Sequence, residues 1–334
     1  MPDGVTLLLI VVLVLAVAFD YINGFHDTAN AIATSVSTRA LRPSHAILMS
    51  ATANFIGALT GTAVAKTIAS GIATTPSGDQ GQIVVAAALV GGIVWDLVTW
   101  RLGIPSSSSH ALIGGLIGAA IASGGVQSLQ LDGIYNKVIL PLVASPIIGI
   151  VIGFAVMVTL LNIFQRAHPK HINDRFRRLQ ILSAAYMALS HGSNDAQKTM
   201  GIITLALVAA GLLPEPTVPL WVILLAASAI AMGTAVGGWR IIRTMGQRVV
   251  KLDPVHGFAA ETTAATVIFG ASSLGVPVST THVISSAIMG VGASDRFSAV
   301  RWGVAGNIVI AWILTIPASG LVAWLAWEVL SRLL

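Results

Sequence analysis

The chain has 334 residues, of which 55% are hydrophobic and only 9% are charged, and its mean hydropathy is +0.86. A soluble domain carries about 25% charged residues, so this composition excludes a water-soluble globular protein. The net charge of +5 would suggest nucleic-acid binding in a soluble protein. Here the basic residues lie between apolar runs, as the positive-inside rule describes, and we expect no nucleic-acid partner.

Uncharged apolar runs recur along the chain, and several exceed the roughly 20 residues needed to cross a bilayer. They cover residues 5–19, 43–65, 80–95, 102–131, 138–165, 216–239, 262–294 and 302–327. We interpret the first run as part of the mature protein, because it lacks the basic n-region of a signal peptide. The runs predict an all-α polytopic membrane protein with about 10–12 apolar helical segments.

The first polar interruption is the segment 23–30, Asn-Gly-Phe-His-Asp-Thr-Ala-Asn. A carboxylate such as Asp27 inside a hydrophobic segment is costly, and it indicates an ion path or a proton relay. His26 and Asn30 flank it, and such surroundings suit a hard cation such as Na⁺ or a proton carried by the acid. The alternative is a buried Asp that a neighbouring base neutralises for packing.

The second interruption, residues 102–110, reads Leu-Gly-Ile-Pro-Ser-Ser-Ser-Ser-His. Proline before hydroxylated residues is typical of a helix start, and a helix N-terminus with free N–H groups and hydroxyls can bind an anion. We therefore predict an anion site at Ser107, Ser108 and Ser109. His110 closes the cluster and would either orient these hydroxyls or have a hydrogen-bonded core role. The alternative is that these hydroxyls bond back to their own turn.

A basic segment at mid-chain, residues 166–178, holds five Lys or Arg in thirteen residues. It divides repeat one (about 1–165) from repeat two (about 179–334), and a second basic stretch follows at 240–251. We interpret both as cytoplasmic loops. Because no Lys or Arg precedes Arg39, the N-terminus is expected outside, so that repeat one crosses an odd number of times and the two repeats are inverted.

Both polar interruptions recur in the second half, in the same order. Asp27 is matched by Asp195 after 168 residues, and His110 is matched by His282 after 172 residues. A duplicated membrane chain with matching breaks predicts broken or re-entrant helices around a transport site between the repeats. The duplication favours the anion-site interpretation over capping, and the second cluster adds the hydroxyls of Ser279, Thr280 and Thr281, with His282 in the same role as His110.

The repeats differ where Asn30 aligns with Lys198. An ammonium group there can take the place of a metal cation, compensate Asp195 or attract an anionic substrate. Asn194 and Gln197 complete this polar segment, and we expect Gln197 and Lys198 to contact substrate. We predict no metal site, because the histidines are scattered without a His-x-x-x-His pair, and we predict no cofactor.

Three further acids lie in or beside apolar sequence. Glu261 heads the uncharged run of residues 262–294 and is a candidate proton or cation site. The alternative is a carboxylate at the headgroup level. Asp20 and Asp96 are weaker candidates for the same role.

Residues 23–34, 105–110, 191–201 and 277–282 resemble the paired signatures of the inorganic phosphate transporter (PiT) family. The likeness extends over essentially the whole chain. It implies an inverted-repeat secondary transporter of the plasma membrane that imports orthophosphate, is energised by a cation gradient and is commonly a homodimer. By this resemblance Asp27, Asn30 and Asp195 handle cation and phosphate, and the two hydroxyl clusters cradle the substrate.

The second signature departs from the sodium-coupled members, which look like Gly-Ala-Asn-Asp-Val-Ala-Asn in both halves. Gln197 and Lys198 stand there instead. Short bacterial members with Gln-Lys resemble proton-coupled, low-affinity carriers that accept phosphate together with a divalent metal. We therefore favour H⁺ over Na⁺ as the coupling ion.

Four alternative functions share parts of this pattern. A sulfate permease of the same fold and a Na⁺-coupled phosphate symporter are the nearest. An intramembrane hydrolase would use a serine with His110, but the Gly-x-Ser-x-Gly elbow is missing and duplication has no catalytic rationale, so we do not expect an enzyme. A passive anion channel would need rings of charges or carbonyls and no coupling acids.

Overall fold

The computed structural model describes residues 6–333, and this part of the chain is almost entirely helical. Its only β feature is an isolated bridge between Ala73 and Leu129. The helices are α1 (Leu7–Ser37), α2 (Pro43–Ala58), α3 (Ala63–Ser70), α4 (Asp79–Leu102), α5 (Ser108–Gly124), α6 (Leu131–Ile134), α7 (Leu140–Phe164), α8 (Pro169–Ala209), α9 (Leu220–Val236), α10 (Trp239–Arg243), α11 (Pro254–Ser273), α12 (Thr280–Asp295) and α13 (Trp302–Leu333). The prediction of an all-α chain is confirmed.

Several helices are long and apolar enough to cross a membrane. Among the described residues these are α1, α4, the continuous segment Leu131–Phe164 that contains α7, and α13. Two more apolar pairs are sharply bent, by 69° between α2 and α3 and by 61° between α9 and the segment Trp239–Arg248. With each bent pair counted as one span there are up to six spans, so the predicted broken helices are present in a multi-pass membrane protein.

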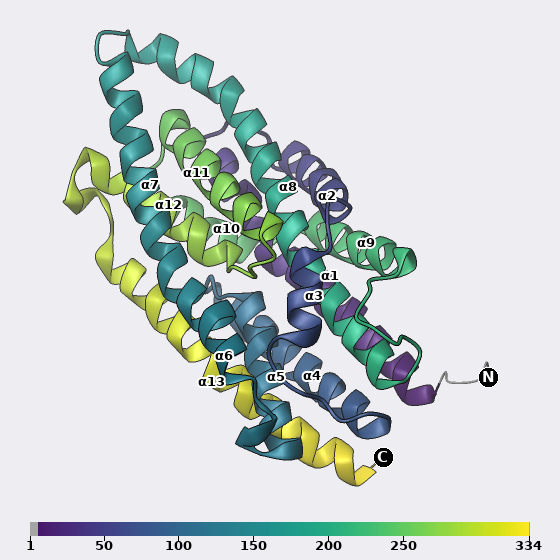
Figure 1. The fold of residues 1–334 in the computed structure, drawn as a ribbon. Coiled ribbons are helices and arrows are strands. Elements are labelled where there is room, and N and C mark those ends of the chain that lie inside the picture. Colours follow the sequence, from purple (N-terminus) through teal and green to yellow (C-terminus); the bar gives the residue numbers. More distant parts are fainter. Residues whose placement is uncertain (1–5, 334) are drawn as a thin grey trace.

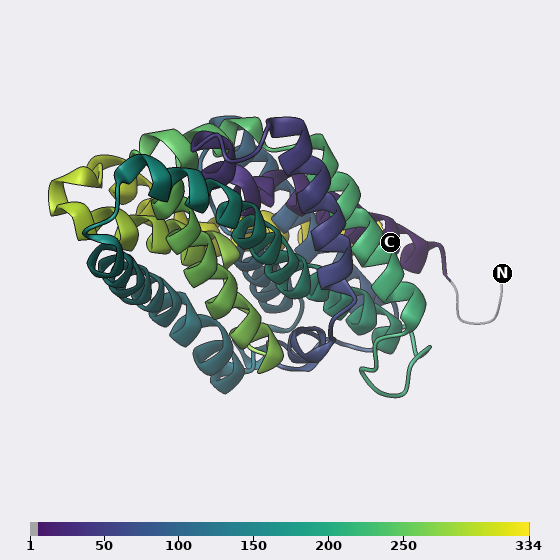
Figure 2. The same ribbon diagram turned by 90° about the horizontal axis from the view of Figure 1, so that it is seen from above.

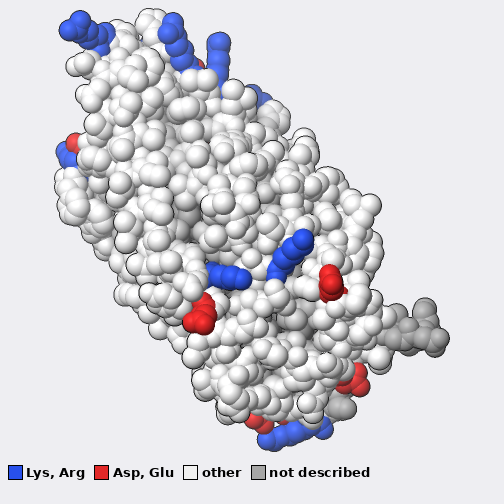
Figure 3. All heavy atoms as spheres, viewed as in Figure 1, with Lys and Arg blue, Asp and Glu red and all other residues white. Residues whose placement is uncertain are grey.

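The two basic stretches are helical rather than loops. Pro169 occupies the first turn of α8, where its fixed φ favours a helix start, so most of the segment 166–178 extends α8 beyond its apolar part. The stretch 240–251 likewise begins as α10 and continues as a π-helical turn from Thr244 to Arg248. Lys and Arg nevertheless gather at the α7–α8 hairpin, at the top of Figure 3, above a broad uncharged band.

The two halves of the chain exchange packing partners. α5 of the first half packs on α13 of the second, and α12 of the second half packs on α7 of the first. In the same way α2 packs on α8, whereas α9 packs on α1. Figures 1 and 2 show α7 and α2 on opposite flanks, with α1 and α8 between them.

Close backbone approach holds α1 and α8 against these partners. A Cβ added to Gly57 of α2 would lie 2.0 Å from the carbonyl oxygen of Leu189 on α8. A Cβ added to Gly233 of α9 would lie 2.0 Å from the carbonyl oxygen of Tyr21 on α1. Helices in lipid associate through such small residues, so α1 and α8 are fixed at the centre of the bundle.

Candidate functional site

The four predicted motifs meet at the centre of the bundle. Asp27 and Asp195 lie in the middle of α1 and α8, and the helices α5 and α12 begin beside them at Ser108 and Thr280. Every site residue predicted from the sequence is 4% exposed or less. The site is therefore enclosed within the protein, where irregular backbone is tolerated at membrane depth.

The starts of α5 and α12 are built alike. Ser107 is the N-cap of α5, and its Oγ accepts a hydrogen bond of 3.2 Å from the backbone N–H of His110. Ser279 is the N-cap of α12 and accepts the same 3.2 Å bond from His282. These two hydroxyls therefore bond back to their own turn. Ser108 differs, because its Oγ has no hydrogen-bond partner among the described residues.

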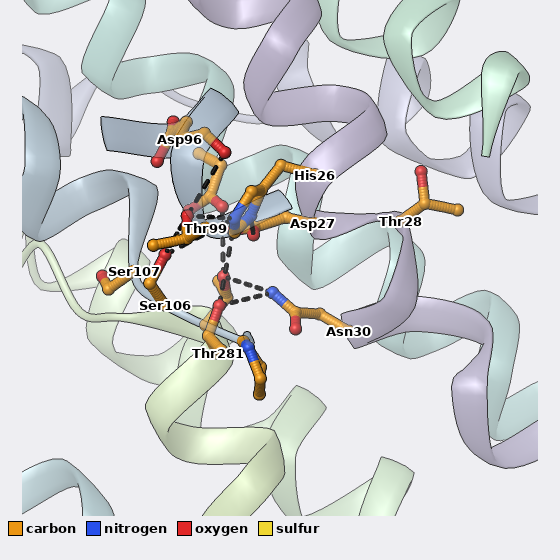
Figure 4. Close-up of polar contacts among 12 residues, drawn as sticks. His26, Asp27, Thr28, Asn30, Asp96, Thr99, Ser106, Ser107 and Thr281 are labelled. Atoms are coloured by element: carbon orange, nitrogen blue, oxygen red, sulfur yellow. Dashed lines mark hydrogen bonds and ion pairs between the residues drawn. The ribbon is translucent and has the colours of Figure 1, made fainter. Parts of the chain in front are cut away.

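Asp27 is held by groups from its own helix and from α12. His26 Nδ1 lies 2.6 Å from Asp27 Oδ1, and Thr281 donates to Asp27 Oδ2 at 3.5 Å. Asn30 Nδ2 donates to the hydroxyls of Thr281 at 2.9 Å and Thr280 at 3.3 Å. Figure 4 shows this group, in which Asn30 and Asp27 point from α1 toward Thr281. The first signature is thus joined to the second hydroxyl cluster.

A further hydroxyl group fixes His26 on the other side. Its Nε2 lies 3.0 Å from the hydroxyl of Thr99 on α4, which also accepts a 2.8 Å hydrogen bond from Ser106. These contacts orient the imidazole so that Nδ1 faces Asp27, as Figure 4 shows. His26 is therefore positioned to orient the Asp27 carboxylate.

Lys198 is the central cation. Its ammonium group contacts the carboxylate of Asp195, the hydroxyl of Ser109 and, at 3.2 Å, the carbonyl oxygen of Val278. The hydroxyl of Thr280 donates to Asp195 Oδ2 at 3.1 Å. One side chain of α8 therefore touches the beginnings of both α5 and α12. A buried charge is tolerated when it is paired and hydrogen-bonded in this way.

Histidines His110 and His282 face each other. Their ring centroids are 4.7 Å apart, and the ring of His282 stacks on Trp312 at 4.0 Å. Nδ1 of His110 and both ring nitrogens of His282 have no hydrogen-bond partner among the described residues. The two side chains therefore do not orient the hydroxyls directly, and only their backbone N–H groups contact the capping serines.

Two predicted amides lie to the side of the site. Gln197 Oε1 accepts the backbone N–H of Val64 at 2.8 Å, and its Nε2 donates to the carbonyl of Ser193. Its amide thus satisfies the start of α3 rather than facing the hydroxyl clusters. Asn194 Nδ2 donates to Ser272 of α11 at 2.8 Å. Both amides brace α8 against neighbouring helices.

Glu261 forms a separate buried group with α1 and α8. Its carboxylate accepts hydrogen bonds from Thr34 and Ser183, and from Gln180 Nε2 at 3.1 Å. Glu261 is 0% exposed, so its carboxylate is enclosed by protein side chains. Its partner Thr34 lies two helical turns beyond Asp27 on α1, about 10 Å along the axis toward the C-terminal end of that helix.

One residue of the site, His191, was not predicted from the sequence. Its Nε2 lies 3.0 Å from Asp195 Oδ2, and its Nδ1 lies 3.0 Å from Asn54 Oδ1. The spacing of four residues on one helix could have revealed the pair. Asp27, His191 and Asp195 offer ligand atoms within 4.8 Å of one another, a set that could hold a metal ion. Although the histidines are scattered in the sequence, His191 is thus positioned to contribute a metal ligand here.

Comparisons with known proteins agree with one another. Residues 23–323 match the family described as the phosphate transporter family. The chain is 48% identical to the "Probable low-affinity inorganic phosphate transporter" of Bacillus subtilis over 99% of both chains. It is 49% identical to the protein of that name from Rhizobium meliloti over 96% of each chain. A solved structure titled "The sodium-dependent phosphate transporter" superposes with a TM-score of 0.89 at 25% identity, covering 98% of this chain and 100% of that one.

Proposed function

The chain belongs to the phosphate transporter family, and from this premise we propose that it imports inorganic phosphate by symport with H⁺ rather than Na⁺. The observation that supports H⁺ is the contact of Lys198 with Asp195. An ammonium there supplies the charge that a bound Na⁺ would bring to this carboxylate, and it repels a second cation nearby. The sodium-dependent structural relative is only 25% identical, which leaves room for a different coupling ion.

We place the phosphate between the starts of α5 and α12. The first N–H groups of a helix have no intrahelical partner, and the positive end of the helix dipole favours an anion. Lys198 adds a full positive charge to the same place, and Ser108 and Thr280 add hydroxyl donors. Two helix starts with one ammonium suit a tetrahedral oxyanion.

The proton would travel on carboxylates. Asp27, bonded to Thr281 of α12, is adjacent to the proposed phosphate position. Inorganic phosphate still carries an exchangeable proton near neutral pH, whereas sulfate has none. A carboxylate acceptor beside the site therefore favours phosphate over sulfate.

Inverted repeats would provide alternating access, since such repeats rock against each other around a fixed site. The exchanged packing of α5 on α13 and of α12 on α7 supports this arrangement. A divalent metal carried with phosphate would be cargo held by the phosphate itself, because Lys198 already pairs with Asp195 and disfavours a second cation there.

Proteoliposomes with labelled phosphate test the proposal. An inward pH gradient with choline in place of Na⁺ should drive accumulation, and excess sulfate should compete poorly. Asp27→Asn removes the titratable group but keeps the shape, so it should abolish accumulation. Strict dependence of the unmodified protein on Na⁺ would contradict proton coupling, and inhibition by sulfate at equal concentration would contradict phosphate specificity.

A further inference from the structure

Polar side chains form one continuous stripe on α1. They are Asp20, Asn23, Asp27, Asn30 and Thr34, which recur every three or four residues and so lie on one face of the helix. All five are 2% exposed or less. With a rise of 1.5 Å per residue the stripe extends for about 21 Å, which is most of the thickness of a bilayer core.

The half of this stripe from Asp27 to Thr34 belongs to the two buried groups around Asp27 and Glu261. Asp27 and Asn30 bond to the threonines at the start of α12, and Thr34 donates to Glu261. The other end of the stripe lies outside both groups. Asp20 lies two helical turns from Asp27, about 10 Å along the axis toward the N-terminus of α1.

Asp20 is a buried acid without a compensating partner. It is 0% exposed, and neither carboxylate oxygen has a hydrogen-bond partner among the described residues. Its polar neighbours are Asn23 and Thr199, whose Oδ1 and Oγ1 atoms are also unpartnered. The charged groups that act on it are Asp195 and Lys198 of α8, which are bonded to each other.

A proton satisfies this group of oxygens. An ionised carboxylate that is buried without a partner keeps the full desolvation penalty of its charge. A protonated Asp20 instead has an O–H to donate to an oxygen such as Asn23 Oδ1, and its second oxygen can accept from the Thr199 hydroxyl. Loss of that proton restores the uncompensated charge on Asp20. The Asp20 side chain therefore suits a role in which each proton that it releases is soon replaced by another.

Asp20 has no acidic equivalent in the second half of the chain. The residue 168 positions after Asp20 is Ala188, a buried core residue. Conversely, the residue 172 positions before Glu261 is Leu89, which is also in the apolar core. Asp20 and Glu261 are thus buried acids at positions where the other half has an apolar residue, and they lie on opposite sides of Asp27 along α1.

We propose that Asp20 is a proton site between the outer surface and the central site, so that Asp20, Asp27 and Glu261 form successive stations for H⁺ along α1. Each transfer moves one proton: Asp20 gives its proton to the Asp27 carboxylate, becomes ionised, and is reprotonated from the outer side. This inference rests on the proton coupling proposed above.

The test uses Asp20→Asn in proteoliposomes, with Asp132→Asn as a matched exposed carboxylate on α6. Two readouts are compared: phosphate accumulation driven by a pH gradient, and phosphate/phosphate exchange at equal pH, which needs no net proton movement. Asp20→Asn should lose accumulation and keep exchange, Asp20→Glu should restore accumulation with a shifted pH dependence, and Asp132→Asn should behave as the unmodified protein.

Three results would overturn the proposal. The first is full accumulation by Asp20→Asn, and the second is loss of both exchange and accumulation in a folded Asp20→Asn protein. The third is a Na⁺-dependent uptake that disappears only in this variant, which would show that the Asp20 carboxylate binds Na⁺ instead of H⁺. Failure of the unmodified protein to respond to the pH gradient would instead contradict the proposed function, so the two failures are distinguishable.

Discussion

Lys198 of α8 donates a hydrogen bond to the hydroxyl of Ser109 in the first turn of α5, a residue 89 positions away in the sequence. The same ammonium contacts the carbonyl of Val278, just before α12 begins. α5 and α12 come from different halves of the chain. A single fixed positive charge therefore lies between two helix N-termini, and this arrangement gives the proposed site its preference for an anion.

Replacing that cation should change the coupling. We expect Lys198→Asn to weaken sodium-free phosphate uptake, because the site loses the ammonium charge and Asp195 loses a buried charged partner. Uptake into proteoliposomes with and without Na⁺ measures this. Lys66→Asn, which removes an exposed lysine of α3, is the control. Unchanged sodium-free uptake by Lys198→Asn would contradict the role assigned to the ammonium.

The hydroxyl donors should determine the affinity for phosphate. Each hydrogen bond to a charged group is worth about 1.5–3 kcal/mol, so the double variant Ser108→Ala/Thr280→Ala should raise the KM for phosphate at least about tenfold. Expression and thermal unfolding should change little. Ser294→Ala, a hydroxyl at the other end of α12 that bonds to its own helix, should leave KM unchanged. A normal KM in the double variant would remove the substrate from this position.

The duplicated motifs predicted much of this site, because polar breaks that recur in the same order in both halves of an apolar chain are typical of a transport site between repeats. Ser108 and Thr280 begin buried helices as the proline and hydroxyl pattern indicates. The partners of individual side chains could not be predicted, since they depend on how helices cross. Gln197 lies beside Lys198 in sequence, yet α8 turns its amide toward α3.

Tertiary packing also determines which acidic side chains are buried. Glu261 follows a basic stretch, and the sequence alone left a headgroup position equally plausible. The structure places the carboxylate among Thr34, Gln180 and Ser183, which come from helices distant in sequence. No local pattern connects these residues. The same holds for Thr99, which reaches His26 only because α4 packs on α1.

The Glu261 group should be needed for coupled uptake. Glu261→Gln keeps the size of the side chain but removes its titratable group. The new NH₂ group faces donors whose hydrogen bonds the carboxylate accepted, and it cannot accept them. We expect gradient-driven accumulation to fall sharply in this variant, while Glu261→Asp retains part of it. Accumulation and phosphate exchange, measured side by side, separate coupling from folding. Equal accumulation by Glu261→Gln and the unmodified protein would show that this acid carries no proton.

The loop before α11 lies at the end of the molecule where the α7–α8 hairpin is found, and it contains a second kind of acid–histidine contact. Asp253 is the N-cap of α11, and its Oδ1 accepts the N–H groups of Val255 and His256 at 2.9 and 3.0 Å. His256 Nδ1 lies 2.7 Å from the same carboxylate, and its Nε2 lies 2.9 Å from Asp295 at the end of α12. The imidazole therefore joins the start of α11 to the end of α12.

This junction should make stability depend on pH. Burial alone would raise the pKa of the Asp253 carboxyl, but the hydrogen bond and charge of His256, with the backbone N–H groups, outweigh it and hold the pKa below its usual value. A lowered pKa gives stability that is present above the unfolded value of 3.8 and is lost as the pH falls through the folded pKa.

Asp253→Ala should therefore lower the free energy of unfolding by about 0.5–2 kcal/mol at neutral pH, the usual cost of losing a side-chain cap. Asp253→Asn keeps a good cap and loses the charge, and its deficit should be smaller because the carboxylate is 45% exposed and partly screened. Thermal unfolding in detergent, compared at neutral and acidic pH, measures both variants. The deficit of Asp253→Asn should shrink in acid, where the native carboxylate also loses its charge, and a deficit that grows in acid would contradict this assignment.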